Sequence, residues 1–153
     1  MSDTSVQALR GSYLMPPLSR ATVGDAMHLG IISCDAETSL AEIARLMAIH
    51  HVHCIAVMAP SHGVDGGDLV WGLLTDLGLI RAGLRLGSDQ SAARALANEP
   101  VMSIRPTMPL RQAAEKMLEH GVNHMIVIDP ETRRPIGVLS TLDIVRVLAW
   151  GEG

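Results

Sequence analysis

Residues 31–57 read IISCDAETSLAEIARLMAIHHVHCIAV, and residues 101–127, seventy positions later, read VMSIRPTMPLRQAAEKMLEHGVNHMIV. Self-similarity of this kind over a fixed spacing indicates an internal repeat. The identical pairs include Ser33 and Ser103, Leu40 and Leu110, Ala44 and Ala114, Met47 and Met117, His50 and His120, Val52 and Val122, and Val57 and Val127. The chain therefore contains one unit twice, and both copies are expected to fold alike.

The duplication continues beyond these stretches. GLLTDLGL (72–79) corresponds to GVLSTLDI (137–144), after a change of register of five residues. The change falls in the turn, because the first copy has the longer glycine-rich loop PSHGVDGGD where the second has DPETRRP. The late copy has Asp143 where the early copy has Gly78, so the two copies differ in one acidic group.

Each copy has the pattern strand, helix, strand, strand, helix. The first helix of each copy has apolar residues at the spacing of one buried stripe, namely Leu40, Ile43, Ala44 and Met47, and Leu110, Ala113, Ala114 and Met117. Ser39-x-x-Glu42 is a capping box for the first of these helices, and Pro109 suits the first turn of the second. The expected strands are 31–34, 54–58 and 69–74, then 101–104, 125–128 and 136–139, and the expected closing helices are 75–86 and 141–150.

A unit of this size is marginal alone, because a domain of about 60 residues buries only about 60% of its surface. We therefore expect an α/β (α+β) fold in which two pseudo-twofold-related β-α-β-β-α repeats pack as one compact module. The expected organisation is an N-terminal extension (1–18), a first repeat (19–86), a linker helix (87–100) and a second repeat (101–150).

Composition excludes several classes of function. Hydrophobic residues make up 48% of the chain and charged residues 18%, as in globular proteins. The net charge of −4 and the absence of a long basic run argue against nucleic acid as a partner. No apolar stretch reaches the roughly 18 residues of a membrane span, and the N-terminus lacks a signal-peptide pattern. Cys34 and Cys54 are interpreted as buried thiols in a reducing compartment, which predicts a cytoplasmic protein.

This repeat, closed by G-h-h-[S/T]-x-x-D, resembles the cystathionine-β-synthase (CBS) domain, and two in tandem resemble a CBS pair. The resemblance covers the chain from about residue 23 to residue 149. It implies that the cleft between the repeats binds an adenosyl compound such as AMP, ADP, ATP or S-adenosylmethionine as a regulatory ligand, with no obligatory cofactor.

The resemblance also implies the residues of the site. A hydroxyl and an acid at the strand-to-helix turn contact ribose and phosphate in this family, and Ser140 and Asp143 match them. His124 stands where some members have a phosphate-binding basic residue, and Ile126 replaces a proline of the central strand. The implied ligand-binding set is Ser140, Thr141, Asp143, Ser103, Met102, His124 and Ile126, with Ser33, Thr75 and Cys54 in a weaker second site.

The turn before the last helix suits a nucleotide on physical grounds. A helix that begins near Ser140 presents free N–H groups and the positive end of its dipole to phosphate. The carboxylate of Asp143 is expected to be left unpaired, so that both hydroxyls of a ribose can donate to it. The alternative is that Ser140-x-x-Asp143 is a plain capping box.

The missing acid predicts two unequal sites. A hydrogen bond to a charged group contributes about 1.5–3 kcal/mol, so Gly78 should weaken ribose binding about ten- to a hundredfold or more. Asp76 lies two residues earlier and points about 160° away around a helix, so it is not expected to substitute. The alternative is divergence of a site that neither copy uses.

Three further features bear on function. The cluster HHVH (50–53) is interpreted as helix-end histidines rather than a metal site, and we expect no metal. Arg133 and Arg134 lie in the second turn, as a solvated tip or as a contact to a phosphate or a partner. The last helix, TLDIVRVLAW, is apolar around most of its circumference, which predicts a homodimer.

The sequence thus predicts a regulatory module that senses an adenosyl nucleotide, mainly at Asp143. No effector domain is expected after the last helix, so the output would pass to an unknown effector protein in trans. The alternative is a ligand-free dimerisation scaffold with vestigial clefts. An enzyme is not expected, because the sequence offers no nucleophile–base pair and no P-loop.

Overall fold

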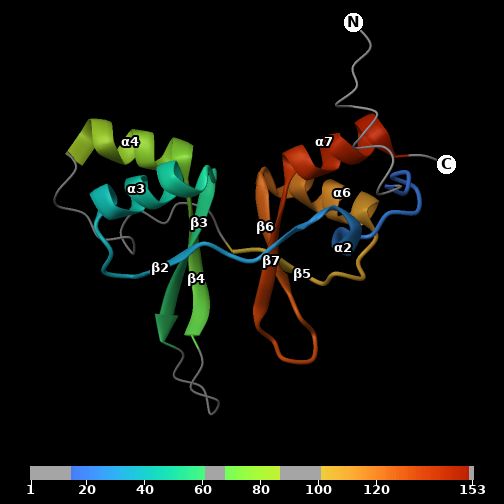
Figure 1. Ribbon diagram of the computed structural model, residues 1–153, viewed down its shortest axis with the longest axis horizontal. Coiled ribbons are helices and arrows are strands. Elements are labelled where there is room, and N and C mark those ends of the chain that lie inside the picture. The colour runs from blue at the N-terminus through green and yellow to red at the C-terminus, as the bar shows by residue number, and fades with distance from the viewer. Residues whose placement is uncertain (1–14, 61–67, 87–100, 152–153) are drawn as a thin grey trace, which may run out of the picture. The chain divides into compact units, whose positions relative to one another are not determined.

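The computed structural model describes residues 15–60, 68–86 and 101–151 of the chain. Its fold is mixed α/β, and the chain divides into two compact units (Figure 1). One unit is drawn from residues 30–102, and the other from residues 1–29 together with 103–153.

The unit of residues 30–102 follows the β-α-β-β-α order that the repeat predicts. Its three-stranded sheet has the order β2-β3-β4, with β2 parallel to β3 and β3 antiparallel to β4. Helices α3 and α4 pack against this sheet and against each other (Figure 1). The elements are β2 (Ser33–Asp35), α3 (Leu40–His50), β3 (Cys54–Pro60), β4 (Asp68–Thr75) and α4 (Asp76–Leu86).

The core of this unit is aliphatic, since the chain has no Phe and only 2% aromatic residues. Ile43, Ile55, Val57 and Leu74 are completely buried. They join the stripe of α3 to alternate positions of β3 and β4, because successive strand residues face opposite sides of a sheet. The same cluster includes Leu40, Met47, Leu79 and Ala82.

The other unit repeats the pattern and adds one strand. Its sheet has the order β1-β7-β6-β5, in which β5 is parallel to β6 and the other neighbours are antiparallel. Leu110, Ala113, Met125, Val127 and Leu139 are completely buried. The elements are α2 (Val23–Ala26), β1 (His28–Leu29), β5 (Ser103–Ile104), α6 (Leu110–His120), β6 (His124–Ile128), β7 (Pro135–Ser140) and α7 (Thr141–Trp150).

The segment that contains α2 and β1 lies in the unit of the second repeat, although the sequence boundaries placed residues 19–29 with the first. Strand β1 pairs with β7 in the register His28↔Val138 and Leu29↔Gly137. The N–H of Val23 donates to the carbonyl of Met108 at 2.9 Å. Two residues of strand carry no periodic signal, so the sequence pattern did not predict β1.

Gly137 is required by this pairing. An ideal Cβ at position 137 would overlap the carbonyl oxygen of His28 and would lie 3.4 Å from Sδ of Met27. The glycine that opens the repeated phrase GVLSTLDI therefore lets β1 cross close to β7.

The helix ends follow the repeat with small differences. The predicted capping box is confirmed, because the N–H of Glu42 donates to Oγ of Ser39 at 3.3 Å and the N–H of Ser39 donates to Oε2 of Glu42 at 3.2 Å. Pro109 is the N-cap of α6, one residue before the first turn where it was expected. His51 and Gly121 end α3 and α6 in the left-handed conformation, with φ of 52° and 65°.

Three predicted features lie outside the described residues: the linker helix (87–100), most of the N-terminal extension and most of the glycine-rich loop. Among the helices that are described, none is both long and apolar enough to span a membrane.

Candidate functional site

The candidate site is built where β7 runs into α7. Ser140 is the N-cap of α7 in extended conformation, and its Oγ accepts the N–H of Asp143 at 3.3 Å. The N–H and the Oγ of Ser140 donate in return to Oδ2 of Asp143, at 2.7 and 2.9 Å. The capping alternative for Ser140-x-x-Asp143 is therefore realised: this box orders the first turn of α7 and fixes one carboxylate oxygen.

The second oxygen of the same carboxylate is held by one side chain from β1 and one from the next turn of α7. Oδ1 of Asp143 lies 2.8 Å from Nδ1 of His28 and 3.2 Å from Nη1 of Arg146. Nη1 of Arg146 also lies 3.2 Å from Nε2 of His28. A neutral imidazole with its proton on Nδ1 satisfies both contacts, since it donates to the carboxylate and accepts from the guanidinium.

The expectation that Asp143 is unpaired is therefore wrong in this structure. Its side chain is 0% exposed, whereas those of His28 and Arg146 are 61% and 41% exposed. A buried carboxylate is costly unless donors surround it, and here four donor groups do so. The carboxylate oxygens differ in kind: a local main-chain and side-chain cap holds Oδ2, and two partly exposed side chains hold Oδ1.

The structure brings several of the other predicted residues together across the sheet. Ser103 is the partner of Ile126 across β5 and β6, and His124 is the partner of Ser140 across β6 and β7. Partners directly opposite each other share a face of a sheet, as do residues two apart on one strand. The four residues therefore lie in two neighbouring rows on one face.

His28 lies on the first of these rows, because it pairs with Val138 and Val138 pairs with Ile126. Of the remaining predicted residues, Met102 is half-buried just before β5. Thr141 is exposed, and its N–H donates to the carbonyl of Asn123 at 3.0 Å.

The corresponding turn of the first repeat has Gly78 at the position of Asp143, so it lacks a carboxylate there. Oγ1 of Thr75 accepts the N–H of Gly78 at 3.1 Å, which is half of a capping box without the returning acid. Oδ2 of Asp76 lies 2.8 Å from Nδ1 of His53, and both side chains are mainly exposed. Asp76 is thus directed to the helix exterior, as its position around the helix predicts.

The other residues of the predicted second site lie near this turn. Cys54 is the partner of Thr75 across β3 and β4, and Ser33 is the partner of Ala56 across β2 and β3. Cys54 is buried and Ser33 is exposed. The two turns therefore have similar backbone geometry. They differ because only the second has Asp143 and the two side chains that contact it, His28 and Arg146.

His28 and Arg146 were not among the predicted site residues. Arg146 follows Asp143 by three positions in α7, a spacing at which helix side chains meet, so this contact could have been predicted. His28 depends on the pairing of β1 with β7 and had no signal in the sequence. Within the described part of the chain, no group of three or more His, Cys, Asp or Glu is placed to hold a metal ion.

Comparison with known proteins assigns the class. The family model of the CBS domain matches residues 23–85 and again 93–149, so the chain belongs to the CBS domain family and contains two CBS repeats.

The individual relatives have low sequence identity to this chain. Hypoxic response protein 1 of Mycobacterium tuberculosis is 28% identical over 129 residues, which are 83% of this chain and 85% of that protein. An uncharacterized protein of Methanopyrus kandleri is 23% identical over 82% of this chain, and the match spans 62% of that protein's length.

A similar solved structure is the CBS domain pair of protein MJ0100 in complex with 5′-methylthioadenosine and S-adenosyl-L-methionine. It has a TM-score of 0.71 and 19% identity, and the match covers 84% of this chain and 96% of that one. At this identity the likeness shows the fold.

Proposed function

We propose that the chain is a regulatory module that binds an adenosyl ligand (AMP, ADP, ATP or S-adenosylmethionine) through Oδ1 of Asp143. The observation that carries the proposal is that the two oxygens of this carboxylate have different kinds of hydrogen-bond partner. Oδ2 is fixed by Ser140, whereas Oδ1 is held by two side chains that are each more than two-fifths exposed. Exposed donors can exchange with the hydroxyls of a ribose at low cost, because water solvates them once they are released.

The exchange requires His28, Arg146 or both to leave Oδ1. A ribose offers two hydroxyl donors, so the carboxylate remains paired when they replace the imidazole and the guanidinium. Arg146 is released next to the N-terminal turn of α7, where helix N–H groups favour an anion. It could then contact the phosphate of a nucleotide or the carboxylate of S-adenosylmethionine.

This exchange couples the ligand to the N-terminal segment. His28 belongs to β1, and its contact with Asp143 holds β1 to α7, in addition to the pairing of β1 with β7. A ligand shifts a conformational equilibrium only by binding one state better than the other. A ligand that needs Oδ1 binds better when His28 has been released, so occupancy favours a state in which α2 and β1 are less firmly held.

The partner surfaces of the proposal are the outer faces of the closing helices. Both helices expose large apolar side chains about one turn apart: Leu77, Ile80 and Leu84 on α4, and Leu142, Val145, Leu148 and Trp150 on α7. A single core needs only one stripe of each helix. We assign these surfaces to a homodimer, and we assign the N-terminal segment to an effector protein in trans.

The second candidate function is a ligand-free dimerisation scaffold. The observation that favours it is the complete pairing of Asp143, whose oxygens have donors without any ligand. In this case His28, Asp143 and Arg146 would only fasten β1 to α7, and the apolar helix faces would be the functional part.

Thermal unfolding with AMP, ADP, ATP and S-adenosylmethionine separates the two functions. A ligand at a hundred times its Kd adds about 2.7 kcal/mol of stability at one site. We expect a shift with the wild type, a loss of the shift in Asp143→Asn, and no loss in Asp76→Asn, the matched variant of the first repeat.

His28→Ala gives the sharper result. Because it removes a competing donor from Oδ1, it should tighten ligand binding about threefold to tenfold. If no ligand of the panel stabilises either the wild type or His28→Ala, the scaffold is the better account.

A further inference from the structure

A pocket lies at the other end of the same sheet. A pocket of about 450 Å³ is formed where β5 and β6 end, between the segment after β5 and the turn that joins β6 to β7. It includes Ile128, four residues along β6 from His124, which neighbours Ser140. At about 3.3 Å per residue, Ile128 lies about 13 Å along the strand from His124, so the pocket is separate from the turn at Ser140 and Asp143, although Ser103 lines the pocket and also belongs to the set implied for the adenosyl ligand.

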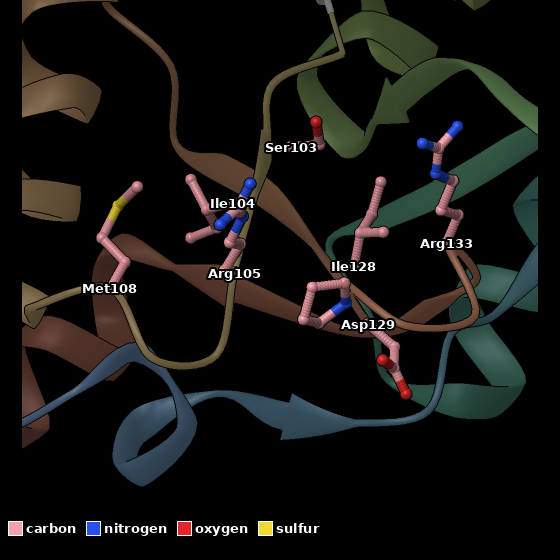
Figure 2. Close-up of a pocket in the computed structure, with 8 residues that line it drawn as sticks. Ser103, Ile104, Arg105, Met108, Ile128, Asp129 and Arg133 are labelled. Carbon is pink, nitrogen blue, oxygen red and sulfur yellow. The ribbon is translucent and has the colours of Figure 1, made fainter.

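The lining of this pocket combines two cations with an apolar floor. Arg105 and Arg133 contribute guanidinium groups, Ser103 contributes a hydroxyl, and Met108 and Ile128 contribute apolar surface. Figure 2 shows the side chains of Arg105, Ile128 and Arg133 extending in one direction and that of Asp129 extending in the opposite direction. Neither guanidinium forms an ion pair with any carboxylate of the described residues.

The carboxylate of Asp129, which also lines the pocket, accepts hydrogen bonds from the backbone of the turn between β6 and β7. Oδ1 of Asp129 accepts the N–H of Glu131 at 2.8 Å and that of Thr132 at 3.5 Å. The N–H of Asp129 donates to the carbonyl of Arg134 at 2.9 Å, which closes the turn. Asp129 therefore serves the backbone of this turn; it forms no ion pair with Arg105 or Arg133, and its carboxylate extends away from them (Figure 2).

The backbone at Arg133 is a second, independent observation. Its φ is 58°, the left-handed region that L side chains rarely adopt, and its N–H donates to the carbonyl of Asp129 at 2.8 Å. Glycine would take this conformation without strain. A strained residue whose long cationic side chain lines a pocket points to a role for that side chain in binding.

We propose that this pocket binds a small molecule that carries a phosphate group, with the phosphoryl oxygens between Arg105 and Arg133. Guanidinium groups pair with phosphate through two parallel hydrogen bonds, and two of them match a dianion in charge. The apolar floor at Met108 and Ile128 receives the remainder of the molecule. The site goes beyond the proposed function, since it uses none of the residues that contact Asp143.

Calorimetric titration with inorganic pyrophosphate at low ionic strength tests the site. We expect saturable binding by the wild type, weakened about tenfold or more in Arg105→Ala and in Arg133→Gly. Arg133→Gly also relieves the strained backbone, so its melting temperature should not fall, and lost binding cannot be ascribed to unfolding. Arg134→Ala is the matched control, because Arg134 is an exposed neighbour that does not line the pocket, and its affinity should stay within about twofold.

The remaining outcomes overturn the proposal. It fails if the wild type does not bind pyrophosphate, or if Arg134→Ala loses as much affinity as Arg133→Gly, which would indicate unspecific attraction. It also fails if Asp143→Asn alters pyrophosphate binding as strongly as Arg105→Ala does, because the anion would then occupy the other site. Retained pyrophosphate binding in Asp143→Asn with loss of the nucleotide response keeps the two proposals separate.

Discussion

The imidazole of His28 lies 2.8 Å from the carboxylate of Asp143, although one residue precedes the first repeat's helices and the other belongs to the last helix of the chain. This contact joins the segment of α2 and β1 to α7. It also occupies Oδ1 of Asp143, the oxygen to which we propose that a ribose binds. The proposed function therefore makes one contact control two things: how firmly the N-terminal segment is held, and whether Oδ1 of Asp143 is free to bind a ligand.

Asp143→Ala should lower the free energy of unfolding by about 2–3 kcal/mol. The change removes the returning half of a capping box, which costs about 1 kcal/mol. It also removes the acceptor for His28 and Arg146, which costs about 1.5–3 kcal/mol, and the two losses are not fully additive because they involve one carboxylate. Urea denaturation measures the effect. Asp76→Ala, which removes an exposed acid at the corresponding turn, should cost less than about 1 kcal/mol. Equal losses in the two variants would contradict the structural role of Asp143.

Gly137→Ala should be strongly destabilising, by about 2 kcal/mol or more, because the new Cβ overlaps the carbonyl oxygen of His28 and forces β1 from β7. Gly83→Ala is the matched control. Gly83 lies inside α4, where an added Cβ meets nothing within 4 Å, so alanine should stabilise the helix by about 0.5–1 kcal/mol. If β1 pairs with β7 as described, thermal or urea unfolding should show a lower stability for Gly137→Ala and a higher stability for Gly83→Ala than for the wild type.

His51→Gly should raise the free energy of unfolding by about 0.5–1 kcal/mol. His51 ends α3 at φ 52°, a conformation that costs an L residue about 1–2 kcal/mol and that glycine adopts freely, at some cost in chain entropy. The second repeat already has Gly121 at the matching position, so Gly121→Ala should show the reverse effect in the same assay. A destabilised His51→Gly would show that this imidazole makes a contact that outweighs the strain.

The Cys34 thiol gives a prediction about alkaline pH. Burial raises its pKa above the ordinary 9.0, and Asp35 adds to the rise, against a hydrogen bond with Thr38 that lowers it. The unfolded chain therefore loses this proton first. The contribution of the buried, protonated thiol to the free energy of unfolding is fully present below pH 9. It is lost as the pH rises through the pKa of the thiol in the folded state.

Denaturation at pH 7 and at pH 10 tests whether the stability falls with rising pH as expected. The wild type should lose more stability between the two values than Cys34→Ala does, because the variant lacks the titrating group. An equal loss in both proteins would show that the thiol is not buried in solution.

The proposed dimer predicts a change of mass. Val145→Glu places a charge in the middle of the exposed apolar face of α7 and should give a monomer in light scattering at micromolar concentration. Leu118→Glu is the control, because Leu118 is 84% exposed on α6, outside the proposed interface, and should leave the dimer intact. A monomeric wild type at that concentration would exclude the homodimer.

Much of the fold follows from short-range patterns. The stripes of α3 and α6, the cap at Ser39 and the strand-to-helix turn at Ser140 depend on residues only a few positions apart, and each lies where the pattern predicts, within a residue or two. Arg146 belongs to this class, since a spacing of three along a helix places it beside Asp143. The unequal turns at Asp143 and Gly78 were also visible in the repeat.

The sequence by itself determined the repeated β-α-β-β-α unit and the residues at its turns, because hydrophobic periodicity and capping are local. Only the tertiary structure decided that β1 joins the sheet of the second repeat, that His28 pairs with Asp143, and that Arg105 and Arg133 line one pocket. These contacts join residues far apart in the chain, and such contacts depend on the folding of the segments between them. Their energies come from burial and from hydrogen bonds to a buried charge, which no pattern of neighbouring residues records.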